Sequence, residues 1–198
     1  MPTTTNQLWV ADITYIRLAE AFVYLAPRLP ALRDGSSASP MMVLDAYSRR
    51  MVGWAMADHL RAELALAALQ MALGSREVIP GGLVHHSDRG VQYACGAYMA
   101  VLERHGIQPS MSRAGCPYDN AMAESFMKTL KQEEVDGRAY RDLAHAQASI
   151  GEFIEQVYNG QRLHSALDYL APVEFEAQLR RPGAAAQQPL AVAATDCP

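Results

Sequence analysis

Three acidic residues of this 198-residue sequence occupy positions from which their carboxylates could act together. Asp12 lies inside an apolar segment, where strand alternation places it on one face with Val10 and Thr14. Asp88 directly follows a short apolar run, at the carboxyl end of a predicted strand, where ligands often bind in α/β sheets. Glu124 lies one turn into a predicted helix. These positions predict a carboxylate cluster.

Such a cluster suits chemistry on phosphodiester bonds, because two divalent cations about 4 Å apart can stabilise both the attacking and the leaving oxygen. Mg²⁺ prefers oxygen ligands, usually a few carboxylates with water and substrate phosphate. Each acid also has a structural interpretation: a hydrogen-bonded strand residue for Asp12, a helix cap for Asp88 and a solvated helix residue for Glu124. The residue types alone leave these alternatives open.

Local patterns predict the elements that would position the three acids. Runs of apolar, β-branched and aromatic residues predict strands at 8–16, 21–26, 41–45, 51–56, 83–86 and 108–112. Helical periodicity and start and stop signals predict helices at 60–73, 91–105, 120–135, 143–158 and 172–179. This order fits a mixed sheet with helices on it, an arrangement that several folds share.

Composition indicates an ordinary globular chain, since half of the residues are hydrophobic and 19% are charged. No apolar run approaches the length of a membrane span, and residues 1–7 lack the apolar region of a signal peptide, so we expect no membrane partner and a cytoplasmic protein. Cys95, Cys116 and Cys197 form no CxxC pair, which argues against a zinc ribbon and a disulfide framework.

The net charge of −4 argues against a nucleic-acid partner, because contacts to phosphate favour Lys and Arg. The distribution of charge offsets this argument. The only two lysines, Lys128 and Lys131, both lie in the segment that carries Glu124. An active-site carboxylate cluster would itself lower the net charge.

Several elements, taken in order, resemble bacterial insertion-sequence transposases of the retroviral-integrase superfamily: WVADITYI, VLDAYSRRMVGWAM, LVHHSDRGVQYA, SMSRAGCPYDNAMAESFMKTLKQE and FIEQVYNGQRLHSALDYLAPVEF. Between Asp88 and Glu124 lie 35 residues, the spacing of the DD(35)E signature. The resemblance covers about residues 6–178, with one interruption.

The resemblance implies a ribonuclease H-like fold, an α/β architecture with a mixed five-stranded sheet flanked by helices. It also implies that Asp12, Asp88 and Glu124 hold two Mg²⁺ (or Mn²⁺) ions. The family reaction is DNA strand nicking followed by strand transfer. Its partners would be the transposon ends, the target DNA and further copies of the chain in a homo-oligomer on DNA, associated with the nucleoid.

The same resemblance suggests DNA contacts near the carboxylates. Lys128 and Lys131 stand at +4 and +7 from Glu124, on one helical face, where lysines of integrases touch DNA; a solvated charged face is the alternative. Tyr118 and Asn120 match the family's YDN element, and Asn120 could cap the helix or contact DNA.

Further residues match the family's motifs. His86 and Arg89 match the HSDRG element, where His86 could position water or phosphate or simply pack in its strand. Arg162, His164 and Ser165 match the terminal element and are interpreted as structural or DNA-facing. Asp45 matches no member of the triad and is interpreted as structural.

Two departures from the family pattern shape the expected domain organisation. A proline-rich insert at 27–41 interrupts the second strand, and a central strand does not accommodate such a segment. Relatives also carry helix-turn-helix segments, upstream or in a partner polypeptide. We therefore expect a short lead at 1–7, a catalytic core at 8–179 and a disordered tail at 180–198, in a truncated transposase.

Two other functions remain open on the sequence. The insert favours a catalytically inactive remnant, and the fold alone would also suit a ribonuclease H-like nuclease. The YDN element and the HSAL element at 164–167 favour the transposase, since a plain nuclease has no need of them.

Overall fold

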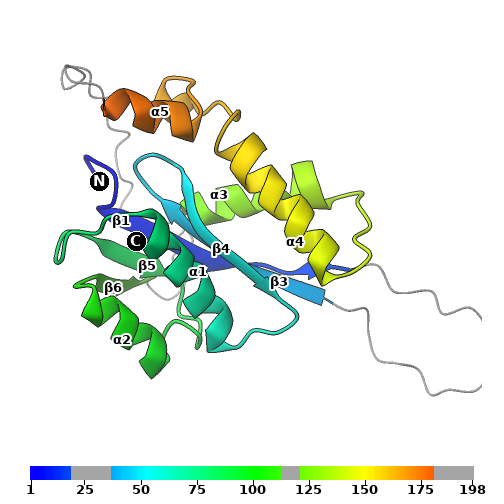
Figure 1. Cartoon of the computed structure of the whole chain (residues 1–198), viewed down its shortest axis with the longest axis horizontal. Helices are drawn as coiled ribbons and strands as arrows, with labels where there is room; N and C mark the ends of the chain where they lie inside the picture. Colours follow the sequence, from blue (N-terminus) through cyan, green and yellow to red (C-terminus); the bar gives the residue numbers. More distant parts are fainter. Residues whose placement is uncertain (19–36, 113–120, 181–198) are drawn as a thin grey trace, which may run out of the picture.

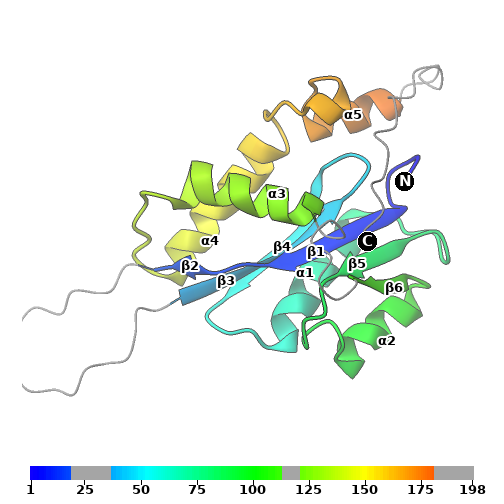
Figure 2. The ribbon, with the colours of Figure 1, turned by 180° about the vertical axis from the view of Figure 1, so that it is seen from behind.

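The computed structural model describes residues 1–18, 37–112 and 121–180. In this part of the chain a twisted sheet is covered by helices on both faces (Figures 1 and 2). One face is covered by α1 (Ala62–Ser75) and α2 (Gly96–Arg104), and the other by α3 (Ala121–Leu130) and α4 (Leu143–Glu152). The predicted α/β class is confirmed.

Within the described ranges the sheet contains six strands, which are β1 (Leu8–Ile13), β2 (Ile16–Arg17), β3 (Ser37–Asp45), β4 (Met51–Ala57), β5 (Val84–Ser87) and β6 (Gln108–Met111). β3 pairs antiparallel with β1, β2 and β4, whereas β1, β5 and β6 run parallel. Because β1 and β2 are successive parts of one strand, the sheet has the five positions that were predicted.

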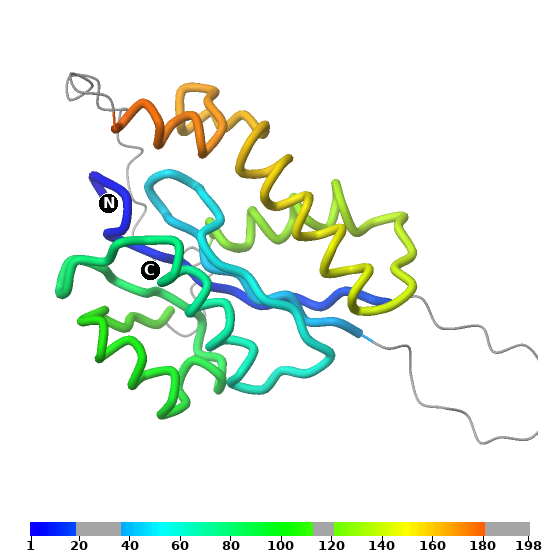
Figure 3. The backbone as a smooth tube through the Cα atoms, viewed as in Figure 1, coloured from blue at the N-terminus to red at the C-terminus, as the bar shows by residue number. Residues whose placement is uncertain are grey.

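The insert at 27–41 was predicted to interrupt the second strand, but its residues Ser37–Met41 belong to β3. Ile13 pairs with Met41, and Ile16 pairs with Ala38, so one register runs unbroken through β1 and β2. The backbone of β3 runs beside both segments (Figure 3). The described part of the insert therefore extends the ladder instead of splitting it. The predicted strand at 21–26 and residues 27–36 lie outside the described residues.

Pro40 explains why the predicted strand at 8–16 divides into two. Its carbonyl oxygen accepts a hydrogen bond from the Thr14 amide at 3.1 Å, but proline has no N–H to return. The ladder is interrupted at Thr14 and Tyr15, and it resumes at Ile16. A proline is tolerated inside this central strand because only one ladder bond is lost.

The helices follow the predictions with altered boundaries. The helix predicted at 91–105 begins at Gly96, because the Cys95 side chain caps it by accepting a hydrogen bond from the Tyr98 amide. Before it, the Tyr93 amide donates to the Gly90 carbonyl and forms a turn. Two predicted helices end in wider π-turns, and two short helices complete the chain: η2 (Lys131–Val135), η3 (Phe153–Tyr158), η4 (Ser165–Leu167) and α5 (Pro172–Leu179). The predicted disordered tail lies outside the described residues, apart from Arg180.

Two apolar cores lie on opposite faces of the sheet, and β1 contributes to both. Trp9 and Ala11 pack with α1 and α2, whereas Val10 packs with α3 and α4. Strand alternation therefore directs Asp12 toward the α3 side. None of the helices in the described ranges is long and apolar enough to cross a membrane.

Candidate active site

The parallel pairing of β1 with β5 brings two of the three predicted carboxylates together. Leu8 pairs with Val84, and the register continues to Ala11 and Ser87. Asp12 and Asp88 are the next residues along the two strands, so they lie at the same level of the sheet. Neighbouring strands are about 4.8 Å apart. The register therefore makes Asp12 and Asp88 neighbours at the end of the ladder.

The third carboxylate comes from α3, which packs across β1. Ala123, Phe126 and Leu130 of α3 are buried in the core, so that Glu124 and Lys128 stay exposed. A cleft of about 410 Å³ separates this helix from the end of β1, and its lining includes Asp12, Thr14, Glu124, Lys128, Lys131 and Asp136. The predicted common face of Glu124 and the two lysines is thus confirmed.

The electrostatics of Asp12 link the three acids. Its pKa is raised to about 6, mainly by burial and in smaller part by the charges of Asp88 and Glu124, although the hydrogen bond from the Ile13 amide and the charge of Lys131 lower it. The carboxyl group of an aspartate ordinarily has a pKa near 4, so Asp12 stays protonated up to a higher pH than usual. The carboxylates lie close enough to repel one another.

The carboxylates have few hydrogen bonds of their own. Oδ1 of Asp12 accepts from the Ile13 amide at 2.8 Å, and Oδ1 of Asp88 accepts from the Gly90 amide at 2.9 Å. Within the described ranges, Glu124 and the second oxygens of both aspartates accept no hydrogen bond. Such carboxylate oxygens are the ligands that Mg²⁺ and Mn²⁺ prefer.

The three side chains do not form a complete ligand set. Among residues 1–18, 37–112 and 121–180, no group of three or more His, Cys, Asp or Glu side chains is gathered tightly enough to hold a metal ion. The donor chemistry therefore fits a divalent cation, while the carboxyl groups stand apart, within electrostatic reach.

The other predicted site residues have varied surroundings. Both ring nitrogens of His86 lie beside serine hydroxyls, Nδ1 2.9 Å from Ser110 and Nε2 3.1 Å from Ser112, which corresponds to the packing interpretation. Arg89 is exposed, and its Nε donates to the Ser112 carbonyl at 3.0 Å. Tyr118 and Asn120 lie outside the described residues.

The sequence interpretation missed an acidic residue of the cleft lining. Asp136 faces the cleft because it directly follows the π-turn η2, where its amide bonds to the Lys131 carbonyl. A regular α-helical period does not predict this position, so the sequence offers no clear signal for it.

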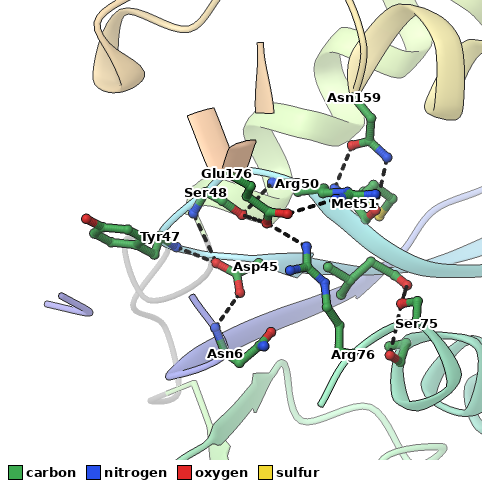
Figure 4. Close-up of polar contacts among 12 residues, drawn as sticks. Asn6, Asp45, Tyr47, Ser48, Arg50, Met51, Ser75, Arg76, Asn159 and Glu176 are labelled. Carbon is green, nitrogen blue, oxygen red and sulfur yellow. Dashed lines mark hydrogen bonds and ion pairs between the residues drawn. The ribbon is translucent and has the colours of Figure 1, made fainter. Parts of the chain in front are cut away.

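A second set of acids lies beyond the opposite end of β1 and is fully partnered (Figure 4). Asp45 is completely buried and accepts hydrogen bonds from the amides of Asn6, Tyr47 and Ser48. The structural interpretation of Asp45 is therefore confirmed.

Glu176 of α5 completes this second set and was not singled out by the sequence. Its carboxylate accepts from Ser48 at 2.7 Å, Arg50 at 2.7 Å and Arg76 at 2.6 Å. Burial raises its pKa, but the bonds from Arg76 and Ser48 outweigh burial and lower it overall. This network ties α5 to the β3–β4 turn and to the end of α1.

The family model "Integrase core domain" matches residues 2–117, and a second model with the same description matches residues 105–172. Together the two matches span both aspartates, Glu124 and both lysines.

Curated relatives are insertion-sequence proteins. The transposase of insertion sequence element IS904 from Lactococcus lactis is 39% identical over 174 residues, which are 88% of this chain and 62% of the relative. Transposase InsF of insertion sequence IS3fB from Escherichia coli is 40% identical over 173 residues, which are 87% of this chain and 54% of the relative. The chain thus spans little more than half the length of these relatives.

Solved structures with the same fold are retroviral integrases. The catalytic core domain of BIV integrase has a TM-score of 0.58 at 13% identity, covering 88% of this chain and 95% of that one. The HTLV-2 integrase catalytic core domain in complex with magnesium has a TM-score of 0.59 at 10% identity, covering 86% and 95%. The predicted ribonuclease H-like fold and the resemblance to insertion-sequence transposases are confirmed, and the chain belongs to the integrase core domain family.

Proposed function

We propose that this chain is the catalytic core of an insertion-sequence transposase, which cuts and joins DNA strands by metal-dependent phosphodiester chemistry. The observations that carry the proposal are the register of β1 and β5, which makes Asp12 and Asp88 neighbours, and the cleft that Asp12 lines together with Glu124. Family membership supports the same reaction class.

Asp12, Asp88 and Glu124 would hold two Mg²⁺ or Mn²⁺ ions through their carboxylate oxygens. When bound, such cations activate the attacking oxygen and stabilise the charge on the leaving oxygen. The raised pKa of Asp12 supports the assignment, because cations would relieve the repulsion among the three carboxylates. One of the solved structures with this fold is described as a complex with magnesium.

The lysines of the cleft would orient the DNA. Lys128 and Lys131 line the same cleft as Asp12 and Glu124, so their ammonium groups can attract backbone phosphates toward the carboxylates. Arg89, beside Asp88, presents an exposed guanidinium that could contact the same strand. Tyr118, Asn120 and His86 remain predicted DNA contacts.

The partners follow from the same proposal. The DNA would comprise transposon ends and a target, bound by a homo-oligomer of the chain, and a solved neighbour is described as an intasome. A helix-turn-helix segment, in the same polypeptide or in a partner, would recognise the ends. The protein would act in the bacterial cytoplasm, on the nucleoid.

A catalytically inactive remnant is the second candidate, and one observation favours it. The three carboxylates are not gathered into a ligand set within the described residues. An inactive chain would keep the fold without closing the site around cations, so the two candidates differ in a measurable activity.

The test uses duplex DNA that carries the sequences bordering the reading frame, incubated with Mg²⁺ or Mn²⁺. We expect metal-dependent nicking and strand transfer by the unaltered protein and loss of both in Asp88→Asn. Asp58→Asn is the matched control, because Asp58 is also an exposed aspartate directly after a strand, but it follows β4 and does not adjoin the paired strands β1 and β5.

The outcomes separate the candidates. Folded protein that nicks no DNA with either metal would favour the inactive remnant. Equal activity of Asp88→Asn and the unaltered protein would refute the assignment of Asp88. Preferred cleavage of an RNA–DNA hybrid would instead indicate a ribonuclease H-like nuclease.

A further inference from the structure

A second polar cavity lies on the other side of α3, away from the carboxylates. It measures about 210 Å³ and is bounded by α3, the β3–β4 turn and the segment from η3 to η4. Leu163 at its rim is 61% exposed, so the cavity reaches the surface. Its polar lining residues are Arg49, Ser125, Thr129, Tyr158, Arg162, His164 and Ser165.

Arg49 is the unusual member of this lining. Burial lowers the pKa of its guanidinium, yet within the described ranges it forms no hydrogen bond or ion pair. Its φ of 59° lies in the left-handed region, where glycine or asparagine would be less strained. Among the described residues, this charged side chain therefore lacks a hydrogen bond or ion pair, at a position whose backbone favours glycine, and its electrostatic neighbour is the Tyr158 hydroxyl. Such unrelieved strain and charge are typical of binding sites.

With the other polar groups included, the cavity keeps a net positive charge. One nitrogen of Arg162 pairs with Glu133, so a single net positive charge remains from the two arginines and this glutamate. His164 lies edge-on to Tyr158, with ring centroids 5.2 Å apart, and its Nε2 is buried without a hydrogen-bond partner in the described structure. Burial, Arg162 and Arg49 together lower the pKa of His164 to about 4. An anion would satisfy these groups.

We propose that this cavity binds a backbone phosphate of DNA, through Arg49 with Arg162 and the hydroxyls of Ser125 and Thr129. The DNA source rests on the proposed function. Charged guanidinium groups with hydroxyl donors are a common way in which proteins bind phosphate.

The position of α3 supports DNA as the source of the phosphate. Ser125 and Thr129 face this cavity, while Glu124 and Lys128 face the first cleft. The two sites are thus separated by one helix, about 10–12 Å across with its side chains. At about 3.4 Å of axis per nucleotide, one strand would span that width in roughly three nucleotides. A strand held in the second cavity would therefore continue toward the carboxylates.

The test compares DNA binding by Arg49→Gly with binding by the unaltered protein, in Ca²⁺ or without metal. Glycine suits the left-handed backbone, so the melting temperature should stay equal or rise. We expect the dissociation constant for labelled duplex to rise about tenfold, and the slope of its logarithm against log salt to fall by about 1. Arg104→Ala, on α2 across the sheet, removes the same charge and should bind normally.

The results distinguish this inference from the proposed activity. Unchanged affinity and salt slope in Arg49→Gly, or an equal loss in Arg104→Ala, would overturn the phosphate site, as would a wild-type protein that binds no duplex. Inorganic phosphate that stabilises only the unaltered protein, with unchanged DNA binding, would identify free phosphate as the ligand and also overturn it. Arg49-dependent binding by a protein that never nicks DNA would support the site and refute the catalytic proposal.

Discussion

Two groups of acids lie near β1 and its neighbours, and they differ in how their charge is balanced. Glu176 has two arginines and a serine as donors, and its pKa is lowered. Asp12 has one backbone donor and two acidic neighbours, and its pKa is raised to about 6. Burial acts in the same direction on both, so the partners decide the outcome.

The difference separates carboxylates that stabilise the fold from carboxylates that oppose it. Glu176 ties α5 to the sheet, and its charge is satisfied within the protein. The repulsion among Asp12, Asp88 and Glu124 is left for a bound species to relieve. Perturbed groups of this kind cluster at functional sites.

Removing the charge of Glu176 should give the largest effect on stability. In Glu176→Gln the buried guanidinium of Arg76 loses its counter-charge, and breaking a buried pair typically costs about 3–5 kcal/mol. We therefore expect the free energy of unfolding, measured by urea denaturation, to fall by about 3 kcal/mol. A change below about 1 kcal/mol would mean that the two acidic groups do not differ as described.

Removing the charge of Asp12 should increase the stability of the protein, in contrast to removing that of Glu176. Asp12→Asn eliminates a carboxylate whose charged form is disfavoured, so at pH 7 the protein should gain about 1–2 kcal/mol, after allowance for solvent screening. Because the folded pKa lies above the unfolded value, this gain should be complete above pH 6 and vanish as the pH falls toward 4. Urea denaturation across this range measures it; a destabilised variant would contradict the account.

Divalent cations should stabilise the protein through the first group of acids alone. Saturation with Mn²⁺ at 100 times its dissociation constant would contribute about 2.7 kcal/mol. The melting temperature should therefore rise by several degrees in the unaltered protein and in Asp58→Asn, but not in Asp88→Asn. An equal rise in all three proteins would indicate binding elsewhere.

The smallest expected effect concerns Lys131, whose charge lowers the pKa of Asp12. Without that charge the folded pKa of Asp12 should rise, so in Lys131→Met the pH above which the destabilisation by charged Asp12 is complete should move upward by a fraction of a unit. The difference in stability between Lys131→Met and the double variant with Asp12→Asn, followed against pH, would reveal this shift. A shift to lower pH would contradict the proximity of the two groups.

The sequence predicted much of the fold because its signals are local. Alternation around Asp12 and the apolar run before Asp88 placed both acids at strand positions, and helical spacing placed Lys128 and Lys131 beside Glu124. Local patterns do not predict the register between strands. That Ser37–Met41 would extend β3, with Pro40 opposite Thr14, depends on pairing between distant segments.

Local patterns also do not predict the partners of Glu176 or the lining of the second cavity. Glu176 meets Arg76 across 100 residues of chain, and nothing near Glu176 in the sequence indicates that partner. Arg49 and His164 form part of one cavity only because η3 and η4 fold back beside the β3–β4 turn. Such sites arise from tertiary packing, which residue spacing does not encode.

The most direct test of the account is anomalous diffraction, at the manganese edge, from crystals of the protein with Mn²⁺ and DNA. We predict a peak within about 2.0–2.3 Å of carboxylate oxygens from Asp12, Asp88 and Glu124, after closure of the three side chains around the ion. Saturated crystals that show no peak among these carboxylates, or a peak that does not touch all three, would contradict the central claim.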